Sequence, residues 1–354
     1  MIKLAIFTPE FCYPSETFII DSTRLDPKHF EVSIVTFKLT NFAKKNLPKK
    51  IKVYVITESK LNETLSTFDM IHVHYLNNLR LLSLNTIKNN YVYVTCHGED
   101  VFKYGRDFIY RYQLKEKIKA VAQLLPVSQN LALDLKKKFK VKPYQIRVMP
   151  LGIDLKKYLF KPKAKLSTPL KLGLAARLVE YKGADDLLKA GQILKSKKYN
   201  CEIHIVGSGP DEKKLKKLAH QLGVSKNTFW HGWLSGKSLI SKLRTFDIYV
   251  APYKTARDGA KDSMTMILKE VMALGIPIIS TTNSAIPELI THEKHGLLVS
   301  ENNPQALASE IENLMQNKKI RQKIVSEGRK RIQKDFNLKN QTQQWLLLKL
   351  FQNL

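Results

Sequence analysis

Short apolar runs alternate with longer polar or amphipathic stretches along most of the chain. The runs are about 4–7 residues long and rich in β-branched and aromatic side chains, as strands are. In the first half they lie at residues 2–8, 31–37, 51–56, 70–75, 91–96, 124–128 and 146–150. Apolar strands separated by helices are typical of a parallel sheet that is covered on both faces. The pattern predicts an α/β domain.

The same pattern starts again after a polar stretch at residues 155–169, which contains two prolines and which we expect to be a linker. Further strands are expected at 170–177, 201–207, 228–232, 247–252, 276–281 and 296–300. Helices are expected at 184–197, 211–223, 303–336 and about 338–353. We therefore predict two Rossmann-like, doubly wound domains facing a cleft, at 1–166 and 167–337. The terminal helix, 338–354, is expected to pack back on the first domain.

Composition favours a protein without a membrane span. The chain has no run of 18 apolar residues, and its first apolar run is too short for a secretory signal. Cys12, Cys96 and Cys201 are far apart in apolar segments, so we expect reduced, buried thiols and no metal site. These features predict a cytoplasmic location.

The net charge of +28 leaves three interpretations open. Lysines gather at residues 44–50, 115–119 and 136–142. They form either a solvated face or a surface that attracts anionic lipid headgroups or a phosphate-bearing acceptor. Nucleic acid is not expected as a partner, because no nucleic-acid-binding motif accompanies the charge.

Two segments of the second domain point to a phosphate-bearing ligand. A strand is expected to end at Ala175–Ala176, with Arg177 directly after it and Lys182 a little further on, and two cations at the carboxyl end of a strand suit a diphosphate. In isolation, both are better explained as surface cations. Gly207 follows the next strand, where a small residue lets backbone approach a ligand or simply makes a tight turn.

The strongest segment is residues 262–270, which follows the strand at 247–252. Asp262 or Ser263 is expected to cap a helix, which would leave the N–H groups of residues 263–266 pointing at a ligand. Glu270 interrupts an apolar helix face, and a buried carboxylate needs partners. Sugar hydroxyls or a structural arginine would both serve.

Three histidines of the first domain follow or lie in strands. His97 comes after the strand at 91–96, which is consistent with either a structural or a functional role. We expect His72 and His74 to face opposite sides of their strand, with core or cleft-lining roles rather than metal-binding ones.

Residues 262–277 resemble the acidic motif of retaining glycosyltransferase family 4, a family with the GT-B fold. The usual form of this motif is E-G-x-P-x-x-x-x-E-A-M-A-x-G-x-P-V. A bacterial exopolysaccharide and lipopolysaccharide subgroup has a D-G-I-P version that is closer to this chain. Other matching motifs follow in order over nearly the whole chain: PSETFI, CHGED, VSQN, MPLGID, VGSGP, WHGW, SAIPELI and HGLLV.

The resemblance implies roles for individual residues. Arg177 and Lys182 would neutralise the donor diphosphate, and Glu270 would bind the ribose. Asp262 and His97 would face the transferred sugar. The remaining donor contacts would come from Gly207, Trp233, Ser263, Met264, Thr265 and Met266.

The implied activity is transfer of a hexose-type sugar from a UDP-sugar or GDP-sugar to a glycan or lipid-linked acceptor in cell-surface polysaccharide or lipopolysaccharide synthesis. No cofactor or divalent metal is implied, and peripheral attachment to the inner membrane face is a further expectation. Asp262, Ser263, Met264 and Thr265 depart from the usual motif, so the sugar pocket is expected to differ. A nucleotide-sugar epimerase, a phosphorylase, or a basic protein that binds nucleic acid or lipid are the alternatives.

Overall fold

Contacts within the chain divide the computed structural model, which describes residues 1–350, into two units. The first unit contains Met1–Gly152 together with the helix that begins at Leu338. The second unit is Ile153–Asn337. The division therefore falls between Gly152 and Ile153, ahead of the expected boundary at 166–167.

The expected linker at 155–169 packs on the second unit. Leu155 and Tyr158 contact the core of this unit, which shields their apolar surface from water. The Nζ atom of Lys163 donates to the carboxylate of Asp247 at 2.8 Å. Apolar burial and this ion pair explain why a lysine-rich and proline-containing stretch is not free chain.

A six-stranded, wholly parallel sheet forms the centre of the first unit, in the order β5-β3-β1-β6-β7-β8. Its strands are β1 (Ile2–Phe7), β3 (Phe30–Thr36), β5 (Lys52–Val55), β6 (Met70–His74), β7 (Tyr91–Cys96) and β8 (Gln123–Pro126). A short pair, β2 (Glu10–Phe11) and β4 (Lys38–Leu39), lies outside the sheet. The run expected as a strand at 146–150 makes only an isolated bridge from Ile146 to Leu124.

The second unit repeats this arrangement with the order β11-β10-β9-β12-β13-β14. Its strands are β9 (Leu170–Ala175), β10 (Cys201–Val206), β11 (Thr228–Trp230), β12 (Ile248–Ala251), β13 (Ile278–Thr281) and β14 (Leu297–Val299). In both units the first strand lies third and the fourth strand lies beside it, which is the doubly wound order of dinucleotide-binding folds. The predicted fold class is confirmed.

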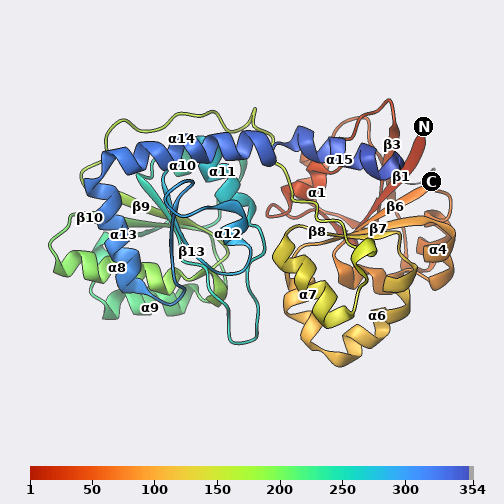
Figure 1. The fold of residues 1–354 in the computed structure, drawn as a ribbon, viewed down its shortest axis with the longest axis horizontal. Helices are drawn as coiled ribbons and strands as arrows, with labels where there is room; N and C mark the ends of the chain where they lie inside the picture. Colours follow the sequence, from red (N-terminus) through yellow and green to blue (C-terminus); the bar gives the residue numbers. More distant parts are fainter. Residues whose placement is uncertain (351–354) are drawn as a thin grey trace. The chain divides into compact units, whose positions relative to one another are not determined.

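Helices cover both faces of the second sheet (Figure 1). One face packs against α8 (Ala184–Ser196), α9 (Glu212–Gln221) and α13 (Pro304–Gln316). The other packs against α10 (Gly236–Leu243), α11 (Met266–Leu274) and α14 (Lys318–Asp335). The short α12 (Ile286–Leu289) completes the unit.

Most helices of the first unit are short, but α6 (Phe108–Ala120) and α15 (Leu338–Leu350) have 13 residues each. The others are α1 (Thr17–Asp21), α2 (Asn41–Asn46), α3 (Leu61–Leu65), α4 (Leu84–Asn89), α5 (Glu99–Phe102) and α7 (Gln129–Phe139). Polar caps begin several of them. The Ser128 side chain accepts the Leu131 N–H at the start of α7. Asn317 caps α14 in the same way and divides the single helix expected at 303–336 into two.

The C-terminal helix α15 belongs to the core of the first unit. Trp345 and Leu348 are almost fully buried there beside Leu4, Met70 and Tyr93. The last residues of the expected helix, 351–353, lie outside the described residues. Burial of a tryptophan side chain accounts for the association of α15 with this sheet.

Candidate functional site

The candidate site lies at the carboxyl ends of β9 and β12. These two strands are neighbours in the sheet, and the chain leaves them in opposite directions along it. Ligands bind at such switch points in doubly wound sheets, because diverging loops leave a crevice there. The loop after β9 carries Arg177 and Lys182, and the loop after β12 leads to residues 262–270. The fold therefore brings together two of the segments that the sequence singled out, the one with Arg177 and Lys182 and the one at 262–270.

Lys182 and Asp262 form an ion pair in this site. The Nζ atom of Lys182 lies 2.5 Å from the Asp262 carboxylate, and both side chains are about seven-eighths buried, at 13% and 15% exposure. The same Nζ atom lies over the rings of Tyr181 and Tyr253, 5.2 and 4.9 Å from their centroids. The aromatic faces and the carboxylate fix the position of this cation.

Gly183 allows the two loops to approach. Its φ of +69° is a left-handed conformation, and a Cβ atom there would lie 1.8 Å from the carbonyl oxygen of Pro252. The loop after β9 therefore packs against the end of β12 at backbone distance. This contact places Lys182 beside the loop that carries Asp262.

Arg177 differs from Lys182, because its side chain is exposed and forms no ion pair or hydrogen bond with a residue that the structure describes. Gly207 lies next to this loop with a φ of +126°, and its Cβ would meet the Ala176 carbonyl oxygen at 1.9 Å. The Gly207 N–H donates to the carbonyl of Gly232 at 2.7 Å, just before the half-exposed Trp233. Arg177, Gly207 and Trp233 thus lie on three neighbouring loops.

Helix α11 begins at Met266, so the expected cap at Asp262 or Ser263 is wrong. Thr265 stands at the cap position in an extended conformation, and its side chain does not cap the helix. Ser263 and Met264 are buried, and Met264 belongs to the core. Packing of Met264 in the core delays the start of the helix. The N–H groups without partners inside α11 are therefore those of residues 265–268.

Glu270 is buried on α11 and accepts a hydrogen bond from the Tyr158 hydroxyl at 2.9 Å. Tyr158 comes from the stretch that was expected to be a linker, so sequence reasoning could not propose it as a partner. The neighbouring Lys269 is fully buried, and burial lowers its pKa to about 7 against the opposing effect of Glu270. The sequence did not single out Lys269, because a lysine within a helical stretch is ordinarily expected to be exposed.

Lys254 ties the loop after β12 to the start of α8. This lysine is 6% exposed, and its Nζ atom donates to both oxygens of Asp185 at 2.8 Å and to Asp186 at 3.1 Å. Its own N–H donates to the Tyr181 carbonyl at 3.0 Å, next to Lys182. The network joins both loops of the site to the start of α8. The sequence signal for Lys254 was its place three residues after a strand, in the run APYK.

His97 belongs to the first unit and follows β7. Its ring packs against Phe18 and Tyr75, with centroids 4.8 and 4.4 Å apart. The buried Asp100 carboxylate accepts the N–H groups of Leu76, His97 and Gly98 at 2.7–3.3 Å. Asp100 thereby holds together the loops after β6 and β7.

His72 and His74 point to the same side of β6, and the expectation of opposite sides is wrong. Residues two apart on a strand share a face. Their ring centroids lie 4.3 Å apart, and both side chains are almost fully buried. The His74 ring hydrogen-bonds that of His97 at 3.0 Å. His72 packs against Trp345 of α15 with centroids 4.5 Å apart.

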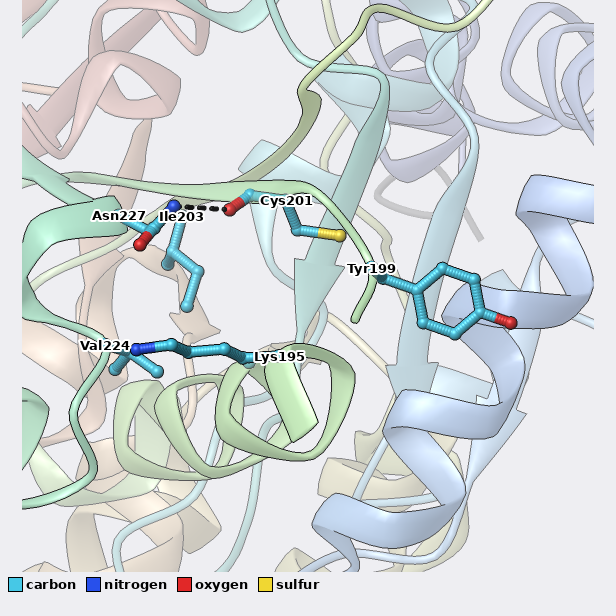
Figure 2. A pocket seen from close by; sticks show the side chains of 7 residues that line it. Lys195, Tyr199, Cys201, Ile203, Val224 and Asn227 are labelled. Carbon is cyan, nitrogen blue, oxygen red and sulfur yellow. Dashed lines mark hydrogen bonds between the residues drawn. The ribbon is translucent and has the colours of Figure 1, made fainter. Parts of the chain in front are cut away.

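A pocket in the second unit lies at the opposite ends of the strands from the candidate site (Figure 2). Cys201 is the first residue of β10, so the pocket is at the amino ends of the strands. Asn227 donates to the Cys201 carbonyl at 3.4 Å across it, and Tyr199 points away toward α13. Lys195 is bound to the Gly223 carbonyl at 2.6 Å. The pocket is therefore distinct from the candidate site, because it lies at the opposite ends of the strands and the side chains of Asn227 and Lys195 already have hydrogen-bond partners.

Residues 1–350 contain neither a disulfide nor a cluster of metal-ligating side chains that would indicate a second site. Cys12 and Cys96 are buried and Cys201 is partly buried, and all three are free thiols. Burial raises the pKa of Cys12 to about 12 and that of Cys201 to about 11. No group of three or more His, Cys, Asp or Glu residues with metal-ligand geometry occurs in this range. None of the helices described is both long and apolar enough to cross a bilayer.

Comparison with known families gives two adjoining matches. The family described as Glycosyltransferase Family 4 matches residues 18–157, and the family described as Glycosyl transferases group 1 matches residues 156–331. The chain belongs to glycosyltransferase family 4. Both loops of the candidate site lie within the second match of this family 4 glycosyltransferase.

Curated relatives of this family 4 glycosyltransferase include AmsK of Erwinia amylovora, an amylovoran biosynthesis glycosyltransferase. AmsK is 30% identical over 273 residues, which cover 76% of this chain and 66% of AmsK. WcaL of Escherichia coli, whose name assigns it provisionally to colanic acid biosynthesis, is 30% identical over 244 residues, covering 68% and 59%. The chain spans about three-fifths to two-thirds of the length of these relatives.

Solved structures share the fold of this family 4 glycosyltransferase. Anabaena HepE, crystallised in complex with UDP, superposes with a TM-score of 0.82 at 16% identity over the whole of both chains. WaaG, which is involved in lipopolysaccharide biosynthesis, superposes with a TM-score of 0.71 at 15% identity, covering 97% of this chain and 98% of WaaG. Both likenesses concern the two-domain GT-B architecture.

Proposed function

We propose that the chain transfers a hexose from a nucleotide-sugar to a glycan or lipid-linked acceptor, with retention of the anomeric configuration, in the synthesis of a cell-surface polysaccharide. The observation that carries this proposal is the site at β9 and β12. Two cations, Arg177 and Lys182, and the N-terminus of α11 lie on neighbouring loops there. Positive charge at this place suits a diphosphate leaving group.

The chemistry assigned to the site needs stabilisation of charge more than acid or base groups. As the bond from sugar to phosphate breaks, negative charge grows on the diphosphate, and preorganised donors lower the energy of that state. Arg177 and Lys182 would supply this stabilisation in place of a divalent ion. We assign the acceptor proton to the donor phosphate, on the same side of the sugar as the leaving group.

Incubation with a panel of UDP- and GDP-sugars, with and without candidate acceptors, tests the proposal through release of nucleoside diphosphate. Release that depends on an acceptor is the expected result, and it should survive chelation of divalent ions. Conversion of the donor without an acceptor would favour an epimerase. Turnover that depends on inorganic phosphate would favour a phosphorylase.

Glu270→Gln is expected to weaken binding of the nucleoside diphosphate by about tenfold. The change removes a charged acceptor from the ribose hydroxyls, and hydrogen bonds to charged groups are worth more than neutral ones. Thermal shift titrations with UDP and GDP measure the affinity, because a ligand of the native state raises the melting temperature. Glu202→Gln, on β10, is the matched control, and equal affinities for both variants would contradict the assignment.

Peripheral attachment to an anionic membrane surface is the second part of the proposal, and helix α6 carries it. Its first two turns expose the large side chains Phe108, Ile109 and Tyr112, at 70%, 64% and 70%. We call these three residues the α6 apolar face. The opposite side of α6 is buried through Tyr110 and Leu114.

Cations lie beside the α6 apolar face and further along the helix. The Arg111 guanidinium lies 5.9 Å from the centre of the Phe108 ring. Lys115 and Lys119, both exposed, continue the line of Tyr112 along the helix. Exposed aromatic side chains next to cations are typical of helices that lie in the interface of an anionic bilayer.

A Phe108→Ser/Tyr112→Ser variant is expected to lose at least tenfold in partitioning to vesicles that contain phosphatidylglycerol, because two large apolar side chains no longer enter the interface. Flotation of the protein with such vesicles, and with neutral phosphatidylcholine vesicles, measures this. Tyr91→Ser removes an exposed aromatic residue at the start of β7 and is the control. Equal flotation with both vesicle types would contradict the attachment.

A further inference from the structure

A chain of three polar side chains runs through the first unit from the end of α1 to His97. The Oγ atom of Ser22 lies 3.2 Å from Nε2 of His74, and Nδ1 of His74 lies 3.0 Å from Nε2 of His97. Ser22 and His74 are almost fully buried, and His97 is partly exposed. The positions of the hydrogen atoms in this chain follow from its buried end.

Ser22 fixes the direction of the hydrogen bonds. Its hydroxyl lies 2.6 Å from the carbonyl oxygen of Ile19, which can only accept. The serine proton therefore points to Ile19, and Oγ accepts the contact from His74. Nε2 of His74 must then carry a proton.

Both histidines are neutral at physiological pH. Burial lowers the pKa of His74 to about 3, and burial together with His74 lowers the pKa of His97 well below its usual value. A neutral imidazole carries one proton, so Nδ1 of His74 has none and accepts from Nε2–H of His97. The single proton of His97 is then on Nε2.

We infer that Ser22 and His74 are positioning residues that hold His97 in the tautomer with a bare Nδ1, so that His97 offers a hydrogen-bond acceptor to a sugar hydroxyl. Ring packing by Phe18 and Tyr75 fixes the plane of the imidazole, and the hydrogen-bond chain fixes which nitrogen is protonated. The role of His97 toward sugar rests on the proposed function. The tautomer itself does not.

Thr23 provides a matched control for Ser22. Its hydroxyl donates to the Ile20 carbonyl at 2.7 Å, one residue along, in the same kind of contact at the end of α1. Within residues 1–350 this hydroxyl makes no hydrogen bond with a histidine. Thr23→Ala therefore removes an equivalent helix-end hydrogen bond and leaves the chain to His97 intact.

Nitrogen-15 NMR of histidine-labelled full-length protein at neutral pH reads the tautomer directly, with His97 assigned by its loss in His97→Gln. The wild type and Thr23→Ala are expected to show His97 protonated on Nε2 alone. Ser22→Ala removes the acceptor of His74, so His74 and His97 can both reverse, and a mixture of His97 tautomers is expected. Ser22→Thr is expected to restore the single form.

Turnover with the active nucleotide-sugar is expected to fall about tenfold in Ser22→Ala and less than twofold in Thr23→Ala, at similar melting temperatures. His97 protonated on Nδ1 in the wild type would overturn the inference. Equal tautomers and equal turnover in the two alanine variants would overturn it as well. Failure of every nucleotide-sugar to turn over would overturn the proposed function, while the NMR result still decides the inference.

Discussion

Lys182→Ala is expected to lower the rate of nucleoside diphosphate release by about 10²–10³-fold, which is the usual effect of removing one preorganised donor from a developing negative charge. Its ammonium group is fixed between Asp262 and the rings of Tyr181 and Tyr253. A cation held in advance costs no reorganisation when the leaving group becomes charged. Steady-state kinetics with saturating donor and acceptor measure the effect on kcat.

Two further variants decide whether the charge of Lys182 is responsible. Asp262→Asn leaves the lysine without its ion-pair partner, and a loss as large as that of Lys182→Ala would move the role from the lysine to the aspartate. Lys197→Ala removes a surface lysine that pairs with Glu312, and full activity is expected. Undiminished turnover in both Lys182→Ala and Arg177→Ala would contradict the diphosphate assignment.

Lys254→Ala is expected to lower the free energy of unfolding by about 3–5 kcal/mol at neutral pH. Removal of one member of a buried ion-pair network leaves its partners charged and with less compensation. Lys254 makes three of the contacts to Asp185 and Asp186, and Lys189 supplies the others. Urea denaturation followed by tryptophan fluorescence measures the change.

The effect of Lys254→Ala is expected to depend on pH in a defined direction. Burial opposes ionisation of Asp185, but Lys254 and Lys189 outweigh it, and the pKa of Asp185 lies below its usual value. A depressed carboxyl pKa contributes stability above the unfolded pKa, and this contribution is lost as pH falls through the folded pKa. The difference between wild type and variant should therefore shrink in acid. Lys216→Ala, which removes an exposed pair with Glu212, should cost less than about 1 kcal/mol.

The fold was predictable because its signals are local. Runs of apolar β-branched residues fix the strands, and their alternation with helices leaves few topologies for a parallel sheet. Arg177, Lys182 and Glu270 could be singled out as candidates from the sequence, since their positions after strands and within an apolar helix face are visible in a linear pattern. The structure adds that the loops after β9 and β12, which carry these residues or lead to them, meet at one switch point.

Other features depend on contacts between distant segments. Nothing near Tyr158 in the sequence indicates that it bonds Glu270, because the two are brought together only by packing of residues 155–169 on the second unit. Helix α11 begins at Met266, later than expected, and Met264 just before it is buried in the core. The role of Lys254 follows from helix α8, far from it in the chain.

Placement of Trp345 in the core of the first unit has a consequence for biosynthesis. During translation, the strands of that unit emerge first, but Leu4, Met70 and Tyr93 gain their last packing partner only when α15 has been made. The whole second unit is synthesised in between. The core of the first unit can thus be completed only after the whole second unit has been synthesised, although the strands of its sheet are translated first.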